Sequence, residues 1–191
     1  MKKIIVGITG ASGSLLAKRL IESLIERNIE VHCVITSHGR EVFEYELSES
    51  FNDFVKALQS PLLNSYSNDS MFAPIASGSF DFDAMLIIPC SMGSLAKIAH
   101  GISDNLLARA ADVALKEKRP LFIIPRETPL STLHLRNMLI LSELGVTIMP
   151  PMPAYYNHPS SLSEITDLTI GRILEKLGIQ NEMHKIWKGS L

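Results

Sequence analysis

Residues 2–13, "KKIIVGITGASG", decide the fold, because they join an apolar run to a cluster of glycines. The apolar run predicts a buried strand, and the spacing G-x-x-G-x-x-G predicts a tight turn that leads into a helix. Apolar residues then recur at helical spacing and share one face: Leu16, Leu20, Leu24 and Ile25. A strand, a glycine turn and an amphipathic helix are typical of the first unit of a parallel α/β sheet.

The same alternation continues along the 191-residue chain. Further strands are expected at 29–36, 82–90, 119–125 and 146–150, and further helices at 37–48, 50–58, 94–102, 105–118, 131–145 and 162–178. Residues 59–79 are rich in turn formers and are expected to form a loop with short strands. Strands that alternate with crossover-length helices predict a single α/β domain over residues 1–191, doubly wound and Rossmann-like, with three layers and a mostly parallel sheet.

Composition excludes several classes of function. The formal net charge of −2 gives no basis for nucleic-acid binding. No apolar stretch approaches the roughly 20 residues of a membrane-spanning helix, and the first residues are better explained by a strand than by a signal peptide. Cys33 and Cys90 supply neither a disulfide framework nor a metal-ligand spacing. We therefore expect a cytoplasmic protein with no metal site, bound to no membrane.

Ligands of doubly wound sheets bind outside the carboxyl ends of the strands. Four loops follow the predicted strands: "TGASG" at 9–13, "PCSMGS" at 89–94, "PRETP" at 125–129 and "PPMPAYYNHP" at 150–159. The first two consist of small and hydroxyl-bearing residues, the third is charged, and the fourth carries aromatic side chains. These loops are where the sequence predicts a binding site.

The first loop is suited to an anion. Gly10 and Gly13 allow backbone N–H groups to approach an anion at a helix N-terminus, and Ser12 adds a hydroxyl. A dinucleotide site also calls for an acidic residue at the end of the second strand, where this chain has Thr36 and Ser37. The pattern favours a mononucleotide over a dinucleotide, and a plain tight turn is the alternative.

The second loop repeats this geometry with Ser91, Gly93 and Ser94, for which plain N-capping of a helix is the alternative interpretation. A third cluster of small residues, "ASGS" at 76–79, is expected to line the same cavity. Arg109 and Lys116 lie two helical turns apart and share a face, which suits either an anion site or a solvated surface.

Taken together and in order, these stretches resemble the flavin prenyltransferase family, the UbiX/Pad1-like proteins. The matching segments cover most of the chain: "GITGASG", "ASGSF", "IIPCSMGSLAKIAHG", "NLLARAADVALKEKRPLFIIPRETPLSTLHLRNML" and "PPMPAYYNHP". The combination "RAADVALKE…PRE" is far more specific than any glycine loop. The resemblance implies a flavoprotein-type fold and a homododecamer whose sites are shared between subunits.

The resemblance also implies an activity. Members of the family join the dimethylallyl group of dimethylallyl phosphate to N5 and C6 of reduced FMN, without a metal. The product, prenylated FMN, is used by a partner UbiD-type decarboxylase. Two other functions remain open: an FMN-dependent decarboxylase of the phosphopantothenoylcysteine type, and a non-catalytic FMN carrier subunit of a decarboxylase.

The family's site residues carry over by position. The implied FMN site consists of Gly10, Ala11, Ser12, Thr36, Ser91, Met92, Gly93, Ser94 and Arg126. The implied contacts to the prenyl phosphate are Arg109, Lys116, Tyr156 and Arg172. The implied catalytic residues are Glu46, Glu127 and Ser12.

The two carboxylates have different expected roles. Glu127 is expected to protonate the leaving phosphate, if burial weakens its acidity, and Glu46 to take the proton that ring carbon C6 loses. Some members of the family place a tryptophan just before "APIASGS". Here the nearest candidates for that aromatic wall are Met71 and Phe72.

Overall fold

The computed structural model describes residues 2–183. It divides into two compact units, Met1–Pro150 and the part of the chain from Pro151 onward, which are described separately below. The predicted single domain over 1–191 also includes Met1 and residues 184–191, which lie outside the described residues, and it stays a prediction.

The first unit alternates strands and helices as the sequence predicts. Its described elements are β1 (Lys3–Ile8), α1 (Ser14–Glu26), β2 (Glu30–Ile35), α2 (Ser37–Leu47), α3 (Phe51–Leu58), β3 (Leu63–Ser67), the short 3₁₀ helix η1 (Pro74–Ala76), β4 (Ala84–Cys90), α4 (Met92–Ala99), α5 (Leu106–Lys116), β5 (Leu121–Pro125), α6 (Thr132–Glu143) and β6 (Thr147–Ile148). The second unit holds a 3₁₀ turn, η2 (Tyr155–Asn157), and the helix α7 (Leu162–Lys176).

The described strands form one six-stranded sheet in the order β3-β2-β1-β4-β5-β6, and every pairing is parallel. This confirms the predicted doubly wound α/β class and sharpens it, since the sheet is wholly rather than mostly parallel. The chain winds outward from β1 to β3 and then returns to β4, so the strand order reverses between β1 and β4. Crevices at such a reversal are where open α/β sheets bind ligands.

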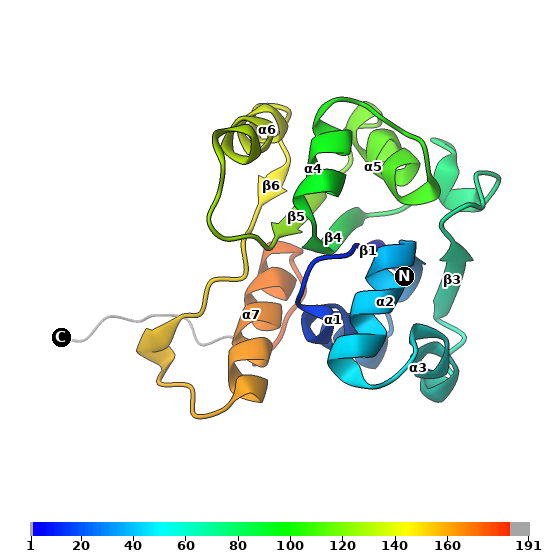
Figure 1. Ribbon diagram of the computed structural model, residues 1–191. Coiled ribbons are helices and arrows are strands. Elements are labelled where there is room, and N and C mark those ends of the chain that lie inside the picture. The colour runs from blue at the N-terminus through cyan, green and yellow to red at the C-terminus, as the bar shows by residue number, and fades with distance from the viewer. Residues whose placement is uncertain (1, 184–191) are drawn as a thin grey trace. The chain divides into compact units, whose positions relative to one another are not determined.

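Helices cover both faces of the sheet, with α1 on one face and α5 on the other (Figure 1). On α1 the buried stripe consists of Ala17, Leu20, Ile21 and Leu24. The predicted stripe included Leu16 and Ile25, which the structure leaves half-buried. The helix is therefore turned slightly from the predicted orientation, so that the small side chain of Ala17 faces the sheet.

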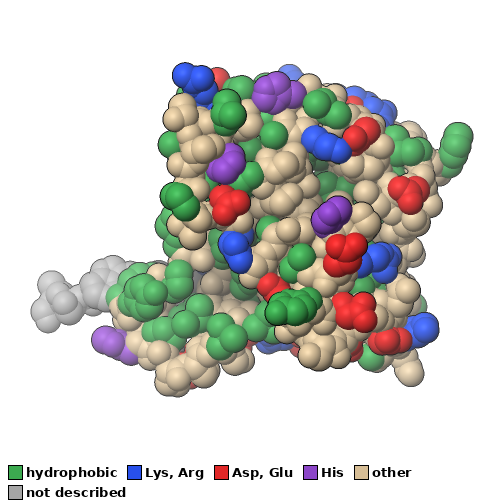
Figure 2. Space-filling view, in the orientation of Figure 1, with side chains coloured by type: hydrophobic (Ala, Val, Ile, Leu, Met, Phe, Trp, Pro, Cys, Tyr) green, Lys and Arg blue, Asp and Glu red, His purple; other side chains and the backbone are tan. Residues whose placement is uncertain are grey.

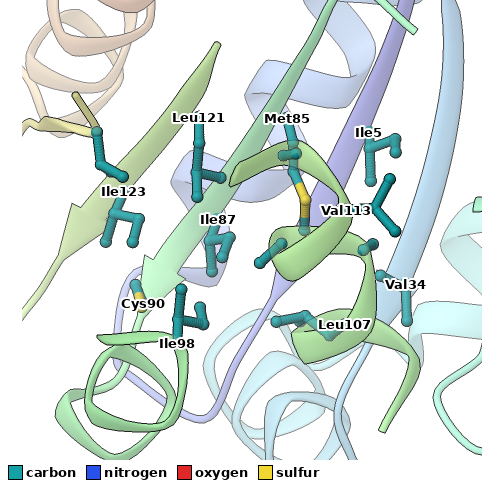
Figure 3. Close-up of a cluster of buried hydrophobic side chains, with 14 of the residues drawn as sticks. Ile5, Val34, Met85, Ile87, Cys90, Ile98, Leu107, Val113, Leu121 and Ile123 are labelled. Carbon is teal, nitrogen blue, oxygen red and sulfur yellow. The ribbon is translucent and has the colours of Figure 1, made fainter. Parts of the chain in front are cut away.

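The core under α5 explains why that helix lies so close to the strands. Three alanines on its inner side have no exposed surface: Ala110, Ala111 and Ala114. On the same helix, Leu107 packs over Gly7 of β1, where a Cβ atom would lie 3.0 Å from the Leu107 Cδ1, and Val113 lies beside Ile5 (Figure 3). Burying a side chain of this size stabilises the fold by about 1.5–3 kcal/mol. The alanines let α5 approach the sheet closely, and its larger side chains fit between those of the strands. The inner side of α5 is therefore fully packed.

Helix α6, in contrast to α5, leaves most of its side chains exposed. It packs against α4 and β6, yet Leu141 is its one buried residue. Leu133, Leu135 and Leu139 are 68%, 53% and 57% exposed. We call these three leucines the α6 surface. Figure 2 shows hydrophobic side chains beside charged ones at the surface of this part of the molecule. Such an uncovered apolar surface is typical of a contact with another chain.

Candidate active site

The carboxyl ends of the strands bring the predicted loops to one edge of the sheet. The Thr36 N–H donates to the Ile8 carbonyl at 3.0 Å, which ties the loop after β2 to the end of β1. The Arg126 N–H donates to the Cys90 carbonyl at 3.1 Å, which ties the loop after β5 to the end of β4. The loops that follow β1, β2, β4 and β5 therefore form a continuous row, which we call the carboxyl edge.

Glu46 lies in this row, at the last turn of α2, and reaches the N-terminus of α1. Its carboxylate accepts hydrogen bonds from the N–H of Ser14 at 2.8 Å and from the N–H of Gly13 at 3.0 and 3.2 Å. Partial shielding from water raises the pKa of Glu46, but hydrogen bonds from Ser12, Ser14 and Gly13 outweigh it, so the pKa lies below its ordinary value. The structure therefore holds an ionised carboxylate beside Ser12.

This arrangement changes the interpretation of the first glycine loop. The anion at the N-terminus of α1 is the chain's own Glu46 side chain, so the N–H groups of Gly13 and Ser14 already have an acceptor. Gly10 has a different role, because a Cβ atom there would lie 2.7 Å from the Cβ of His38. Its missing side chain lets the first turn of α2 approach the loop after β1.

The second loop caps helix α4 and also leaves part of its backbone exposed. Ser91 caps α4, since its Oγ accepts from the Ser94 N–H at 3.3 Å and donates to the Ser94 Oγ at 3.1 Å. The capping interpretation of Ser91 is therefore confirmed. Gly93, in the first turn of the same helix, faces open space, and a Cβ atom there would meet no atom within 4 Å. The backbone at Gly93 is thus accessible to a ligand, next to the buried Met92.

Thr36 and Ala11 also lie on this edge. Thr36 caps α2 by accepting the Gly39 N–H at 3.0 Å on its hydroxyl. Ala11 is buried in the turn after β1, where its N–H donates to the Thr9 carbonyl at 2.9 Å.

Sequence reasoning missed Thr9, which is 1% exposed between the first two loops. Its hydroxyl donates to the Pro89 carbonyl at 2.9 Å and accepts the Ser91 N–H at 2.7 Å. The one signal in the sequence was a hydroxyl-bearing residue directly after an apolar run, where a fully apolar strand would continue.

The charged third loop is open to solvent in the single chain. Arg126 and Glu127 are both exposed, and the Glu127 carboxylate accepts the N–H of Thr128 at 3.0 Å. The predicted proton donation by Glu127 depended on burial, and the chain alone does not provide it.

Lys116 lies at the opposite end of the sheet from these loops. It ends α5 just before β5 begins, and it forms an ion pair with Glu117. A Cβ atom on Gly78 would lie 2.6 Å from the Lys116 Nζ, so the "ASGS" loop packs directly on this lysine. Arg119 donates to the carbonyls of Phe80 and, at 3.2 Å, Gly78. We call this region the amino edge.

One expectation is corrected by this placement. Ser77 and Ser79 flank Gly78 at the amino edge, so within one chain the "ASGS" loop does not line the same cavity as Ser91. Lys116 likewise does not meet the first two loops within one chain. The physical reason is the direction of α5, which runs back from the carboxyl edge to the start of β5.

Arg109 stands between the two edges, seven residues before Lys116 and therefore about 10 Å from it along the helix. Its Nε donates to the Ala76 carbonyl at 3.0 Å, and its Nη1 pairs with Asp112 at 2.6 Å. It is half-buried, and in this structure it fastens η1 to α5.

The other predicted site residues lie in the second unit and in the loop after β3. In the second unit, Tyr156 is 49% exposed in η2, and Arg172 of α7 pairs with Glu175 at 2.6 Å. Their membership of the site stays a prediction. In the loop after β3, Phe72 is fully exposed and Met71 partly so, and neither forms an aromatic wall within this chain.

Residues 2–183 offer neither a metal site nor a membrane-spanning helix. In that range no three His, Cys, Asp or Glu side chains are grouped so as to hold a metal ion, and no helix is long and apolar enough to cross a bilayer. Cys33 and Cys90 are free and buried, and burial raises the pKa of Cys33 to about 12 and that of Cys90 as well. Both thiols are thus held in their unreactive protonated form.

Comparison with known proteins places the chain in a family. The Flavoprotein family matches residues 1–177. The flavin prenyltransferase UbiX of Methanocaldococcus jannaschii is 47% identical over 185 residues, which cover 97% of this chain and 98% of that protein.

Two solved structures match nearly the whole chain. AnUbiX (PadA1), in complex with FMN and dimethylallyl pyrophosphate, is 37% identical with a TM-score of 0.94 and covers 100% of this chain and 99% of its own. A dodecameric FMN-dependent UbiX-like decarboxylase from Escherichia coli O157:H7 is 43% identical with a TM-score of 0.92, and the match covers 98% and 100% of the two chains. The chain belongs to the Flavoprotein family and, within it, to the UbiX-like flavin prenyltransferases.

Proposed function

We propose that this protein is a flavin prenyltransferase that joins the dimethylallyl group of dimethylallyl phosphate to N5 and C6 of reduced FMN. The observation that carries the proposal is the Glu46 carboxylate, held ionised beside Ser12 where the strand order reverses. A base at this point is suited to removing a proton from a ring bound across the carboxyl edge.

The residues of the carboxyl edge fit FMN. Hydroxyls of Thr36, Ser91 and Ser94 and the accessible backbone at Gly93 offer hydrogen bonds to phosphate and to the polar rim of the isoalloxazine. Arg126 adds a positive charge on the same edge. The reduced flavin supplies the nucleophilic nitrogen and carbon, and the protein positions it.

The chain's own side chains have two roles in the proposed reaction, one at the flavin ring and one at the leaving phosphate. Glu46, ionised at neutral pH, accepts the proton that the ring carbon loses. Lys116, Arg172 and the Tyr156 hydroxyl bind the phosphate and stabilise its negative charge as the allylic C–O bond breaks. Glu127 donates a proton to that phosphate once a neighbouring chain shields it from water.

We further propose that the site is completed between copies of the chain in a homododecamer. Within one chain, Glu46 lies at the carboxyl edge and Lys116 at the amino edge, so both reach one substrate pair only if they come from different copies. Arg109 accompanies Lys116 on α5. The α6 surface supplies apolar area for the assembly. The similar protein from E. coli O157:H7 is described as dodecameric.

The product, prenylated FMN, is passed to a UbiD-type decarboxylase. A cytoplasmic location stays a prediction, in keeping with two free, buried thiols.

The deciding experiment is anaerobic incubation of the protein with reduced FMN and dimethylallyl phosphate, followed by mass spectrometry of the extracted flavin. We expect a flavin heavier by one five-carbon unit. A parallel incubation with dimethylallyl diphosphate shows which ester is the donor. An unchanged flavin mass with both esters, while FMN stays bound, would identify a carrier. Release of carbon dioxide from phosphopantothenoylcysteine would identify a decarboxylase.

A further inference from the structure

We propose that Thr9 is a positioning residue that sets the spacing between the two FMN-binding loops. The inference rests on the proposed function, because it takes the loops after β1 and β4, which carry the implied FMN residues Ser12 and Ser91, to bind FMN. Thr9 itself is 1% exposed and therefore does not touch a ligand. It acts through Ser91, whose N–H donates to the Thr9 hydroxyl at 2.7 Å.

The need for this hydroxyl arises from Pro89. The backbone pairing of β1 with β4 extends to Gly7 and Ile87, and on the other side of β4 its pairing with β5 shifts register between Ile87 and Cys90. Pro89 has no N–H to donate, so the parallel ladder cannot continue through it. Instead, both the N–H and the hydroxyl of Thr9 donate to the Pro89 carbonyl, at 3.2 and 2.9 Å.

The contacts of Thr9 extend into both loops. Its hydroxyl accepts the N–H of Ser91, and Ser91 in turn caps α4 by accepting the N–H of Ser94. Its carbonyl accepts the N–H of Ala11 at 2.9 Å and so shapes the turn that carries Ser12. A single buried side chain therefore sets where the N-terminus of α4 lies relative to the turn after β1.

The hydrogen bonds of the Thr9 hydroxyl limit which residues can replace Thr9. The hydroxyl donates one hydrogen bond and accepts another at the same time. Serine keeps both capacities, whereas valine keeps the shape of threonine and has neither. A valine leaves the partly buried Ser91 N–H without this acceptor, and the loops are then free to separate.

The test compares Thr9→Val, Thr9→Ser and Thr166→Val with the unmodified protein. Thr166 is a matched control, since it is also buried and its hydroxyl donates to the Leu162 carbonyl within its own helix. FMN affinity is measured by flavin fluorescence, kcat and KM for FMN by product formation, and folding by circular dichroism and Tm. We expect Thr9→Val to raise Kd and KM for FMN about tenfold, as the loss of one buried hydrogen bond implies. Thr9→Ser and Thr166→Val are expected to stay within about twofold.

The possible outcomes separate the two proposals. If the unmodified protein neither binds nor prenylates FMN, the proposed function fails. If it does both and Thr9→Val lowers only the Tm, with FMN affinity unchanged, Thr9 is merely structural and this inference is overturned. Should Thr9→Val not fold, Thr9→Ala decides in its place. Failure of both variants to fold also counts against the inference, since a purely structural role then accounts for the bonds.

Discussion

The two edges of the sheet carry different chemistry. The carboxyl edge holds hydroxyls, accessible backbone and the ionised Glu46, and it lies where the strand order reverses. The amino edge holds cations, with Lys116 and Arg119 packed on the backbone of the "ASGS" loop. One edge suits a flavin and the other a phosphate. The contrast teaches why we propose a site shared between copies: the two sets of groups lie at different edges of one chain, so two copies can each present a different edge to the substrates.

The largest loss of activity is expected when the proposed base is removed from the carboxyl edge. Glu46→Gln keeps the shape of the side chain but cannot take a proton, so we expect prenyl transfer to fall about 100-fold or more. Single-turnover assays under anaerobic conditions measure the loss, with FMN binding checked separately. Glu49→Gln is the matched control, because Glu49 pairs with Lys18 at 2.6 Å just after α2. Full activity in Glu46→Gln would exclude Glu46 as the base.

The amino edge is tested by Lys116→Met, which removes the cation from the proposed phosphate site. We expect a loss of roughly 100-fold, since a single charge-stabilising group contributes about that much. Lys118→Met, two residues further on, serves as the control.

Combining the two inactive variants tests whether the edges meet between copies. When Glu46→Gln and Lys116→Met chains are coexpressed or refolded together, a random mixture gives intact sites in about a quarter of cases. Activity should therefore return, although each variant alone is inactive. Mixed assemblies that form and stay inactive would place both residues in the same chain's site.

Gly78→Ala is expected to have a smaller effect, confined to the amino edge. A Cβ atom there would lie 2.4 Å from the Glu117 Oε1 and 2.6 Å from the Lys116 Nζ, so the pair must move. We expect KM for the prenyl ester to rise about tenfold, whereas stability should change little, because the clash is with the far ends of two flexible, partly exposed side chains. FMN affinity, which depends on the other edge, should be unchanged. A matching loss of FMN affinity would show that the two edges are not independent.

The smallest expected effect is a pH dependence of stability at the amino edge. His32 is buried at the start of β2, where its Nε2 lies 2.8 Å from Glu30 and its Nδ1 lies 2.8 Å from the Tyr66 hydroxyl. Burial lowers the pKa of His32, while the bond to Glu30 partly offsets this and the charge of Lys3 adds to it. The stability that neutral His32 contributes is therefore present above the unfolded pKa of about 6.5 and is lost as pH falls through the folded pKa.

Denaturant unfolding between pH 7 and 5 measures this loss. The free energy of unfolding should fall more steeply with decreasing pH in the unmodified protein than in His32→Leu. Equal slopes in the two proteins would show that His32 does not titrate differently on folding.

The fold was largely predictable because it rests on local periodicity. Short apolar runs indicate strands and apolar residues at helical spacing indicate helices, as at residues 84–90 and 14–26. The alternation of such segments implies a parallel sheet. The hydroxyl loops could be found for the same reason, since they follow strands directly. That much of the site follows from position along the chain.

The pairings within the site were not predictable in this way. Glu46 meets Gly13 across 33 residues, and nothing local to either residue indicates the contact. The placement of Lys116 had a usable signal, because a helix that leads straight into a strand must end at that strand's amino end. Thr9 was overlooked because its role depends on a proline 80 residues away.

The separation of Glu46 from Lys116 also bears on when the enzyme works. A newly synthesised chain carries both halves of the machinery but at opposite ends, so we expect it to be inert until other copies dock against it. Dilution below the assembly threshold should therefore switch off turnover without unfolding the protein.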